Sequence, residues 1–484
     1  MKKRTKGQEK EKRIRFPNPI QVIGGIFAAL FLAMSIYLCR YAYTNRQVMM
    51  SNSYNTRQKI LLEQNIRGDI LARDGEVLAH SEADAEGNEI REYPFANLFA
   101  HVIGFATKGK SGVEALENYY LLRSDMALSE KARCADEGRK FPGDVVTTTL
   151  DVGLQQTAYK ALAAYRGAIV ATDVRTGEIL AMVSKPDFDP NEIDAIWSDL
   201  VAAGDEDSRL LNRVTQGIYP PGSTFKIVTA LEYLRENPAS YQNFRFTCGG
   251  SFTHDGETIH CFHGESHGSL DFYKAFQKSC NSAFANIGVT LDHDDFADTL
   301  KQLGFGEELA LELPYTKSRA KIDRDTEDGD VMQLSIGQGT TAMTPIHLNM
   351  ITQSIANGGV MLSPRVVLSV DSADGKNIKH SEVQEVGRVM SEEEAQILTE
   401  MMTLVVNGGT GKRLEGLSYQ AAGKTGSAEF NSKQKAESHA WFTGFAPAED
   451  PQIAVTVIVE EAGGGGEYAV PMAKRMFDAW FGTE

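Results

Sequence analysis

A serine and a lysine three residues apart, Ser223 and Lys226, form the pair in this chain best suited to nucleophilic catalysis. They follow Pro220-Pro221-Gly222, which cannot readily continue a helix, and the residues after Ser223 predict a helix to about Arg235. A spacing of three places both side chains on one face near the helix N-terminus. A desolvated lysine amine has a depressed pKa, so Lys226 could remove the serine proton and activate the hydroxyl for attack on a carbonyl.

Two further short motifs carry groups that could complete such a site. Ser279-Cys280-Asn281 separates two helix-like segments, 271–278 and 282–291, so its serine and asparagine can point from a tight turn into one cleft. Lys424-Thr425-Gly426, followed by Ser427, lies among small residues. That composition predicts an edge strand whose backbone a ligand can approach closely.

Each motif taken alone is a weak signal, because such short patterns recur by chance. The pairs Ser318/Lys321 and Ser432/Lys435 repeat the Ser-x-x-Lys spacing, but they lie in charged stretches with no apolar helix behind them. We expect both pairs to be solvated surface. A single motif is explained equally well by a helix-capping serine or a surface lysine, whereas an ordered set of all three, each in a suitable context, is specific.

The ordered set resembles the active-site serine penicillin-recognising enzymes, whose three motifs converge on one cleft. Other segments resemble one subgroup of these enzymes, the class B penicillin-binding proteins. Residues 67–75 look like the opening motif of that family, and residues 167–191 look like the first strands of its transpeptidase domain. The segments 335–339 and 439–447 also match. The resemblance implies an α/β (α+β) domain with an antiparallel sheet flanked by helices, preceded by a small N-terminal pedestal domain.

The resemblance also implies a reaction, the cross-linking of peptidoglycan by a D,D-transpeptidase. The substrates would be stem pentapeptides ending in D-Ala-D-Ala, and β-lactam antibiotics would acylate the same serine. The implied roles are nucleophile for Ser223, base for Lys226, proton relay for Ser279, orientation of the base for Asn281, a positive field from a charged Lys424, and substrate binding for Thr425, Gly426 and Ser427. The backbone N–H groups of Ser223 and Ser427 would form the oxyanion hole.

Three alternatives remain open. A D,D-carboxypeptidase differs only in the acceptor that it chooses. A β-lactam hydrolase or sensor is disfavoured because no additional general base is marked for deacylation and the second motif is Ser-x-Asn. An inactive scaffold for a glycosyltransferase is disfavoured because all three motifs are intact.

The N-terminal segment predicts a membrane anchor. Residues 16–39 carry no charge and are mostly apolar, and the preceding residues include eight basic side chains against two acidic ones. We place a cytoplasmic basic tail at 1–19 and a single transmembrane helix at 20–43, with the remainder outside the cytoplasm of a bacterial cell. The alternative is a cleaved signal peptide. The net charge of −16 argues against nucleic acid as a partner.

Beyond the anchor, a polar stretch at 44–143 is assigned to the pedestal and residues 144–484 to the transpeptidase domain. Residues 454–459 predict a late strand and 473–481 a closing helix. No cofactor is expected. The family resemblance implies a membrane glycosyltransferase that polymerises lipid II as a partner.

Cysteines near the second motif leave one question open. Cys248 and Cys261 flank a stretch rich in histidine, and an extracytoplasmic location permits a disulfide between them. A zinc site is the alternative, but the spacing fits no standard ligand pattern. We expect no metal, with the disulfide favoured slightly over free thiols and Cys280 acting as a small packed residue.

Overall fold

The computed structural model describes residues 19–44, 57–84, 88–204, 208–429 and 438–483, and its contacts divide the chain into two units, 1–59 and 60–484. In the first unit, helix α1 (Pro19–Thr44) reaches a mean hydropathy of 2.3 and has no buried side chain. Its 26 residues extend about 39 Å, enough to cross a bilayer core of about 30 Å. The helix includes the predicted span at 20–43, whereas nearly all of the predicted basic tail lies outside the described residues.

A five-stranded antiparallel sheet lies at the centre of the second unit. Its order is β17 (Ala422–Ala428), β18 (His439–Ala446), β19 (Ile453–Val459), β7 (Gly167–Asp173) and β8 (Ile179–Lys185). These strands are small or apolar at almost every position because both faces are covered. The predicted edge strand and late strand are confirmed as β17 and β19.

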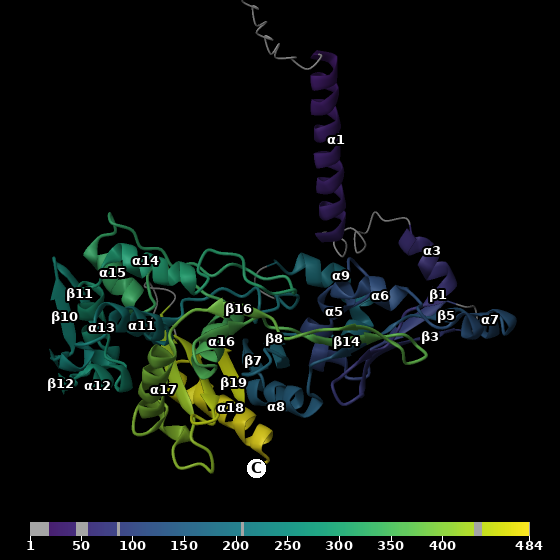
Figure 1. Ribbon diagram of the computed structural model, residues 1–484. Helices are drawn as coiled ribbons and strands as arrows, with labels where there is room; N and C mark the ends of the chain where they lie inside the picture. Colours follow the sequence, from purple (N-terminus) through teal and green to yellow (C-terminus); the bar gives the residue numbers. More distant parts are fainter. Residues whose placement is uncertain (1–18, 45–56, 85–87, 205–207, 430–437, 484) are drawn as a thin grey trace, which may run out of the picture. The chain divides into compact units, whose positions relative to one another are not determined.

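Helices cover the two faces of this sheet, and alternate strand residues enter two separate cores. Helices α8 (Val152–Leu162) and α18 (Gly465–Phe481) cover one face (Figure 1). Helix α16 (Pro345–Ala356) packs against the other face and is buried on nearly every side. The closing helix was predicted to begin at residue 473, but it starts at Gly465 because Pro471 is accommodated inside the helix.

A helical region beside α16 carries two of the three motifs. The turn η3 (Gly222–Phe225) runs directly into α11 (Lys226–Glu236), which confirms the predicted helix start after the prolines. Helices α12 (Phe272–Gln277) and α13 (Asn281–Gly288) follow, with a tight turn between them. The other helices of this region are α14 (His293–Gln302), α15 (Asp328–Ser335) and α17 (Glu392–Val406), and its short strands are β9 (Phe246–Cys248), β10 (Ser251–His254), β11 (Glu257–His260) and β12 (Gly268–Leu270).

A second sheet of six strands joins distant parts of the chain. Its order is β15 (Asn377–His380), β14 (Val367–Asp371), β6 (Val145–Thr148), β2 (Ile70–Leu71), β3 (Val77–Ala83) and β4 (Glu89–Glu92). Strand β6 pairs parallel with β2 and antiparallel with β14. The proposed boundary at residues 143 and 144 therefore lies immediately before a strand whose partners come from both sides of it.

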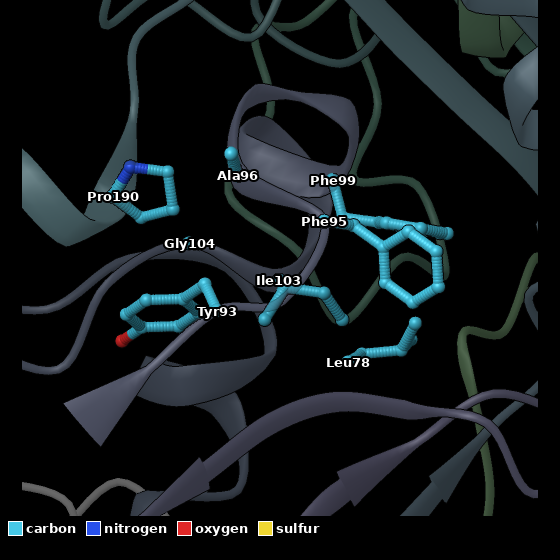
Figure 2. A pocket seen from close by; sticks show the side chains of 8 residues that line it. All are labelled: Leu78, Tyr93, Phe95, Ala96, Phe99, Ile103, Gly104 and Pro190. Carbon is cyan, nitrogen blue, oxygen red and sulfur yellow. The ribbon is translucent and has the colours of Figure 1, made fainter.

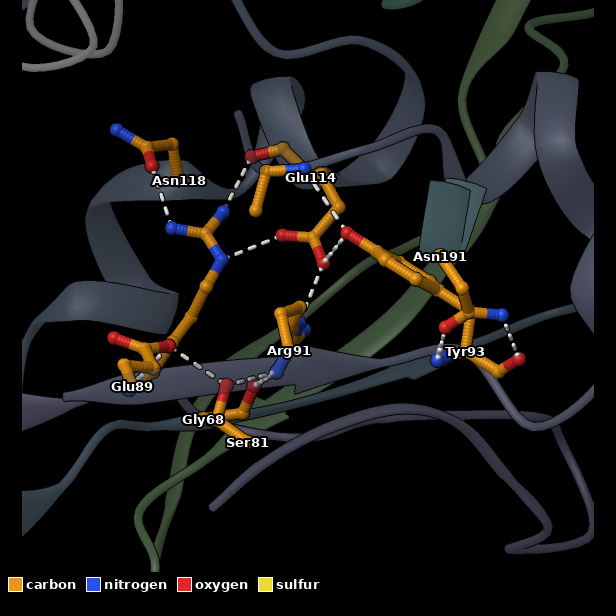
Figure 3. Close-up of polar contacts among 10 residues, drawn as sticks. Gly68, Ser81, Glu89, Arg91, Tyr93, Glu114, Asn118 and Asn191 are labelled. Carbon is orange, nitrogen blue, oxygen red and sulfur yellow. Dashed lines mark hydrogen bonds and ion pairs between the residues drawn. The ribbon is translucent and has the colours of Figure 1, made fainter. Parts of the chain in front are cut away.

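The N-terminal part of this unit contains a buried ionic cluster (Figure 3). The Glu114 carboxylate, fully buried, accepts from Arg67 Nε at 2.5 Å and from Arg91 Nε at 2.7 Å. The hydroxyl of Tyr93 donates to the same carboxylate at 3.2 Å, and the backbone N–H of Tyr93 donates to Asn191 Oδ1 at 2.9 Å. The cluster is thereby linked to the segment that follows β8.

Tyr93 also borders a small apolar pocket (Figure 2). Its other lining residues include Leu78, Phe95, Phe99 and Ile103. The remaining elements of this region are short: α3 (Arg57–Gln64), β1 (Asn65–Ile66), η1 (Ala96–Phe99), α4 (Ala100–Ile103), α5 (Gly112–Leu116), α6 (Asn118–Leu122), α7 (Leu128–Asp136) and β5 (Phe141–Pro142).

Candidate active site

The predicted nucleophile and base meet at the start of α11. Ser223 lies in the turn η3 and Lys226 is the first residue of the helix. Lys226 Nζ is 3.1 Å from Ser223 Oγ, and the lysine side chain is completely buried. The fold therefore brings the amine and the hydroxyl within hydrogen-bond reach, as general-base activation requires.

The other hydrogen-bond partners of Lys226 determine whether its amine donates to the Ser223 hydroxyl or accepts from it. Nζ lies 2.6 Å from the Ser279 carbonyl oxygen and 2.7 Å from Asn281 Oδ1, and Asn281 Nδ2 donates to the His260 carbonyl at 3.0 Å. Both oxygens can only accept, so a neutral amine would use its two N–H groups there. Its lone pair would then be left for the Ser223 hydroxyl proton.

Burial has the largest effect on the charge of Lys226. Removal of the amine from water lowers its pKa to about 7, and the thiols of Cys280 and Cys261 partly oppose this shift. A substantial fraction of the amine is therefore neutral near physiological pH, in agreement with the depressed pKa that a base at this position needs.

Ser279 lies between the two buried lysines. Its Oγ is 2.8 Å from Lys424 Nζ and 3.3 Å from Lys226 Nζ. Ser279 lies in the turn between α12 and α13, where its backbone adopts a positive φ of 54°, which is uncommon for a residue other than glycine. A hydroxyl at this position can pass a proton between Lys226, beside the nucleophile, and Lys424 on β17.

The structure corrects one expectation about Lys424. This residue was expected to carry its charge on an edge strand that a ligand can approach, but its side chain is completely buried. Burial lowers its pKa well below the ordinary value, and the nearby Lys226 lowers it further. A positive charge on Lys226 therefore disfavours the charged state of Lys424.

The strand β17 brings the third motif to the nucleophile turn. Thr425 Oγ1 lies 2.5 Å from Thr410 Oγ1, and Ser427 Oγ accepts from the Gly465 N–H at 3.3 Å. A Cβ on Gly426 would lie 2.9 Å from the Pro221 carbonyl oxygen, so a larger residue would push the strand away from η3. The glycine is needed for this close approach.

Two positioning residues were not among the predicted site residues. Gly337 has a φ of 73°, its carbonyl accepts from the Gly222 N–H at 2.9 Å, and a Cβ there would lie 2.2 Å from the Gly222 oxygen. The segment 335–339 had been noted only as a family match. Thr410, which holds Thr425, had no sequence signal except the neighbouring glycines.

The two other Ser-x-x-Lys pairs lie outside the candidate site. Ser318 was expected on the surface but is only 1% exposed, and its Oγ accepts a hydrogen bond from the Thr344 N–H at 3.1 Å. Lys321 does face solvent, where it pairs with Asp323. The pair Ser432/Lys435 lies outside the described residues.

The cysteines beside the second motif are not joined by a disulfide. Cys248 and Cys261 are free, and their sulfur atoms are 3.6 Å apart, against about 2.05 Å in a disulfide bond. Cys280 and His267 complete a group in which every potential ligand atom lies within 4.8 Å of the others. The favoured disulfide is therefore wrong for this structure, because the fold gathers three thiols and an imidazole where the sequence suggested a pair.

Comparison with known proteins gives two family matches. The penicillin binding protein transpeptidase domain matches residues 167–478, and the penicillin binding protein A dimerisation domain matches residues 67–142. The first match covers more than half of the chain and includes all three motifs.

Named relatives agree with these matches. The peptidoglycan D,D-transpeptidase PbpA of Mycolicibacterium smegmatis is 32% identical over 452 residues, covering 87% of this chain and 91% of the relative. The peptidoglycan D,D-transpeptidase MrdA of Acinetobacter baumannii is also 32% identical, over 448 residues, and covers 81% of this chain. The match spans 66% of MrdA, just under two thirds of its length.

Solved structures share the fold. A ceftriaxone acyl-enzyme complex of penicillin-binding protein A from Mycobacterium tuberculosis matches with a TM-score of 0.78 at 30% identity, covering 86% of this chain and 98% of that one. The D,D-transpeptidase domain of a peptidoglycan glycosyltransferase from Eggerthella lenta matches with a TM-score of 0.77 at 29% identity, covering 87% and 99%. This chain belongs to the penicillin-binding protein transpeptidase family.

Proposed function

We propose that this chain is a serine-type peptidoglycan D,D-transpeptidase that β-lactams inhibit by acylating Ser223. The observation that carries the proposal is the placement of Lys226 Nζ, 3.1 Å from Ser223 Oγ and held by two oxygens that can only accept. Relatives named as D,D-transpeptidases, and a related structure with a β-lactam bound as an acyl-enzyme, support the same reaction.

In the acylation step, Ser223 Oγ attacks the carbonyl carbon of the penultimate D-Ala while Lys226 takes its proton. The backbone N–H groups of Ser223 and Ser427 stabilise the oxyanion of the tetrahedral intermediate. Its collapse breaks the peptide C–N bond, and the proton reaches the leaving D-Ala amine through Ser279. The 2.8 Å contact from Lys424 to Ser279 Oγ supports this relay.

Deacylation transfers the acyl group to an amine of a neighbouring stem peptide. The amine attacks the ester carbonyl, loses a proton to Lys226, and releases Ser223. Lys424 and the hydroxyls of Thr425 and Ser427 lie along the strand beside the nucleophile turn, where they can hold the terminal carboxylate of the donor peptide. That carboxylate would favour the charged form of Lys424 when substrate is bound.

Labelling with a fluorescent penicillin tests the assignment of the nucleophile. Wild-type protein and Ser318→Ala, which alters a Ser-x-x-Lys pair outside the site, should both form a stable adduct. Ser223→Ala should form none while keeping the wild-type circular dichroism spectrum. An adduct of the expected mass on Ser223→Ala would overturn the assignment.

A donor and acceptor assay separates the transpeptidase from its alternatives. With a stem pentapeptide and an acceptor amine, a transpeptidase gives a cross-linked product together with free D-Ala. Free tetrapeptide as the sole product would indicate a carboxypeptidase. Rapid turnover of nitrocefin without a lasting adduct would indicate a hydrolase.

We also propose that α1 is a single-pass anchor with the N-terminus in the cytoplasm and residues 60–484 outside. The apolar helix and the basic residues before it support this orientation. Protease added to intact spheroplasts should degrade the catalytic region. Protection until the membrane is lysed would reverse the orientation.

A membrane glycosyltransferase is the proposed partner, because cross-linking needs newly polymerised glycan strands. In a reconstituted membrane with lipid II, cross-linked glycan should form only when a polymerase is added. Equal cross-linking of unpolymerised lipid II would remove the need for such a partner.

A further inference from the structure

Four side chains that the proposed mechanism does not use converge behind the Ser-x-Asn turn. Cys248 ends β9, Cys261 follows β11, His267 precedes β12, and Cys280 is the N-terminal cap of α13. These strands and this helix lie together at one end of the second unit (Figure 1). The cluster therefore joins two small two-stranded sheets, β10–β11 and β9–β12, to the helix that carries Asn281.

The distances within this cluster are those of a tetrahedral metal site. The sulfur of Cys261 is 3.6 Å from that of Cys248 and 3.7 Å from that of Cys280, and Cys248 Sγ is 3.4 Å from His267 Nδ1. With zinc bonds of about 2.3 Å to sulfur and about 2.0 Å to nitrogen, tetrahedral geometry requires about 3.8 Å between sulfurs and about 3.5 Å from sulfur to nitrogen. These three separations agree with the required values to within about 0.2 Å, and all four ligand atoms lie within 4.8 Å of one another.

The surroundings suit thiolate ligands. The three cysteines are at most 3% exposed. The N–H groups of Gly250 and Ala283 donate to the sulfurs of Cys248 and Cys280, each at 3.4 Å, and Ser282 Oγ is 3.1 Å from Cys261 Sγ. Donors aimed at the sulfur atoms are the usual outer partners of a metal-bound thiolate.

A disulfide and an ordinary apolar core both account less well for the cluster. A disulfide would use two thiols and leave a third thiol and an imidazole buried beside it. A purely apolar core would not place the imidazole of His267, whose side chain is 11% exposed, against sulfur. Three thiols with one imidazole, buried and with no open position, form a donor set typical of structural zinc.

We propose that Cys248, Cys261, His267 and Cys280 bind one structural zinc ion that fixes the Ser-x-Asn turn. Binding releases the thiol protons to solvent and involves no oxidation or reduction. Cys280 stands between Ser279 and Asn281, the two residues whose oxygens hold Lys226. An ion bound to Cys280 would anchor this turn, including the positive φ of Ser279, to the two small sheets.

Metal analysis of the full-length protein, purified in detergent with a thiol reductant and no chelator, tests the site directly. About one zinc ion per chain is expected for the wild type, and the same for Cys134→Ser, which alters a buried cysteine in α7. His267→Ala should lose most of the metal and His267→Cys, which supplies a fourth thiolate, should retain it. A wild-type protein that is free of zinc and does not bind added zinc would overturn the proposal, as would a mass 2 Da lower with a Cys248–Cys261 disulfide.

Cobalt substitution reports the geometry independently of activity. Protein loaded with cobalt(II) should show thiolate charge-transfer absorption in the near ultraviolet and the intense visible bands of a tetrahedral ion. Weak visible bands typical of six-coordinate cobalt would contradict the proposed ligand set.

The effect of zinc on the Ser-x-Asn turn rests on the proposed function, so it is measured by acylation, separately from metal binding. Removal of zinc by a chelator, at a temperature where the circular dichroism spectrum is unchanged, should slow penicillin acylation about 10–100-fold, and zinc but not magnesium should restore it. An unchanged acylation rate would remove the role in positioning and leave the metal site standing. Absence of acylation by the zinc-loaded wild type would instead contradict the proposed function.

Discussion

Two clusters of buried charge in this protein differ in the way that they are neutralised. In the N-terminal region, Glu114 is held by two guanidinium groups, at 2.5 and 2.7 Å. In the candidate active site, Lys226 and Lys424 are equally buried, but the hydrogen-bond partners of both amines are neutral oxygens.

The charge state of each cluster follows from this difference. Burial by itself would raise the pKa of Glu114, but Arg67 and Arg91 outweigh burial and hold it below its ordinary value. Burial lowers the pKa of both lysines because no carboxylate opposes it. A buried charge held by counter-ions stays ionised, and removal of one partner is costly, whereas a buried amine without a counter-ion can serve as a neutral base, as proposed for Lys226.

The largest expected effect is on acylation by Lys226→Arg. A guanidinium cannot be deprotonated near neutral pH, so the base is lost. We expect the second-order rate constant for acylation by one penicillin to fall by about 10²–10⁴-fold. The unfolding free energy should fall by about 1–3 kcal/mol, because the larger side chain must fit a fully enclosed site. Wild-type acylation by Lys226→Arg would show that Lys226 is not the base.

Glu114→Gln should give the converse result. Loss of the carboxylate leaves two buried guanidinium groups without a counter-ion, so the unfolding free energy should fall by about 3–5 kcal/mol. The acylation rate constant of the folded protein should stay unchanged. Glu137→Gln, which alters an exposed pair with Arg139, is the matched control and should cost at most about 1 kcal/mol. Denaturant unfolding would measure both variants, and equal stabilities would contradict the role given to the Glu114 cluster.

Lys424→Arg should have an intermediate effect. Arginine keeps the charge, but the site is fully enclosed and the larger side chain must displace its neighbours, at a cost of about 1–3 kcal/mol. Acylation should weaken but remain measurable, and it should be faster than in Lys226→Arg. If Lys226→Arg were as fast or faster, the roles of the two lysines would be exchanged.

The dependence on pH is the most gradual of the four effects. The base must be neutral, so the acylation rate constant should rise with pH and level off above about 7. Between about 7 and 10.5 an unfolded lysine binds a proton that the folded one lacks. The unfolding free energy should therefore rise by about 1.4 kcal/mol per pH unit in that window. Lys226→Arg stays charged in both states and should lack this contribution, which urea titrations across the pH range can measure.

Much of the candidate active site could be predicted because its key residues lie in short sequence patterns. Pro220-Pro221-Gly222 predicted the start of the helix that carries Lys226, and small residues around Lys424 predicted an edge strand. Those signals depend on backbone preferences of a few consecutive residues. The order of the three motifs then indicated that distant segments share one site.

Features that depend on tertiary packing could not be predicted in this way. The burial of Lys424 is set by elements packed over the strand, whereas the small residues around it in the sequence predicted a strand that a ligand can approach. The support that Gly337 gives to Gly222 joins residues more than a hundred positions apart. The approach of His267 and Cys280 to the two expected cysteines likewise needed the fold, since the four ligands come from four separate elements.

The six-stranded sheet has a mechanical consequence. Strand β14 (Val367–Asp371) forms a backbone ladder with β6, and β6 continues the ladder to β2. Tension applied to the N-terminal segments along these strands would load several hydrogen bonds at once, in shear, rather than opening them one by one. Pulling on β2 along the strand direction would therefore move the catalytic region with it, because β6 and β14 share the load.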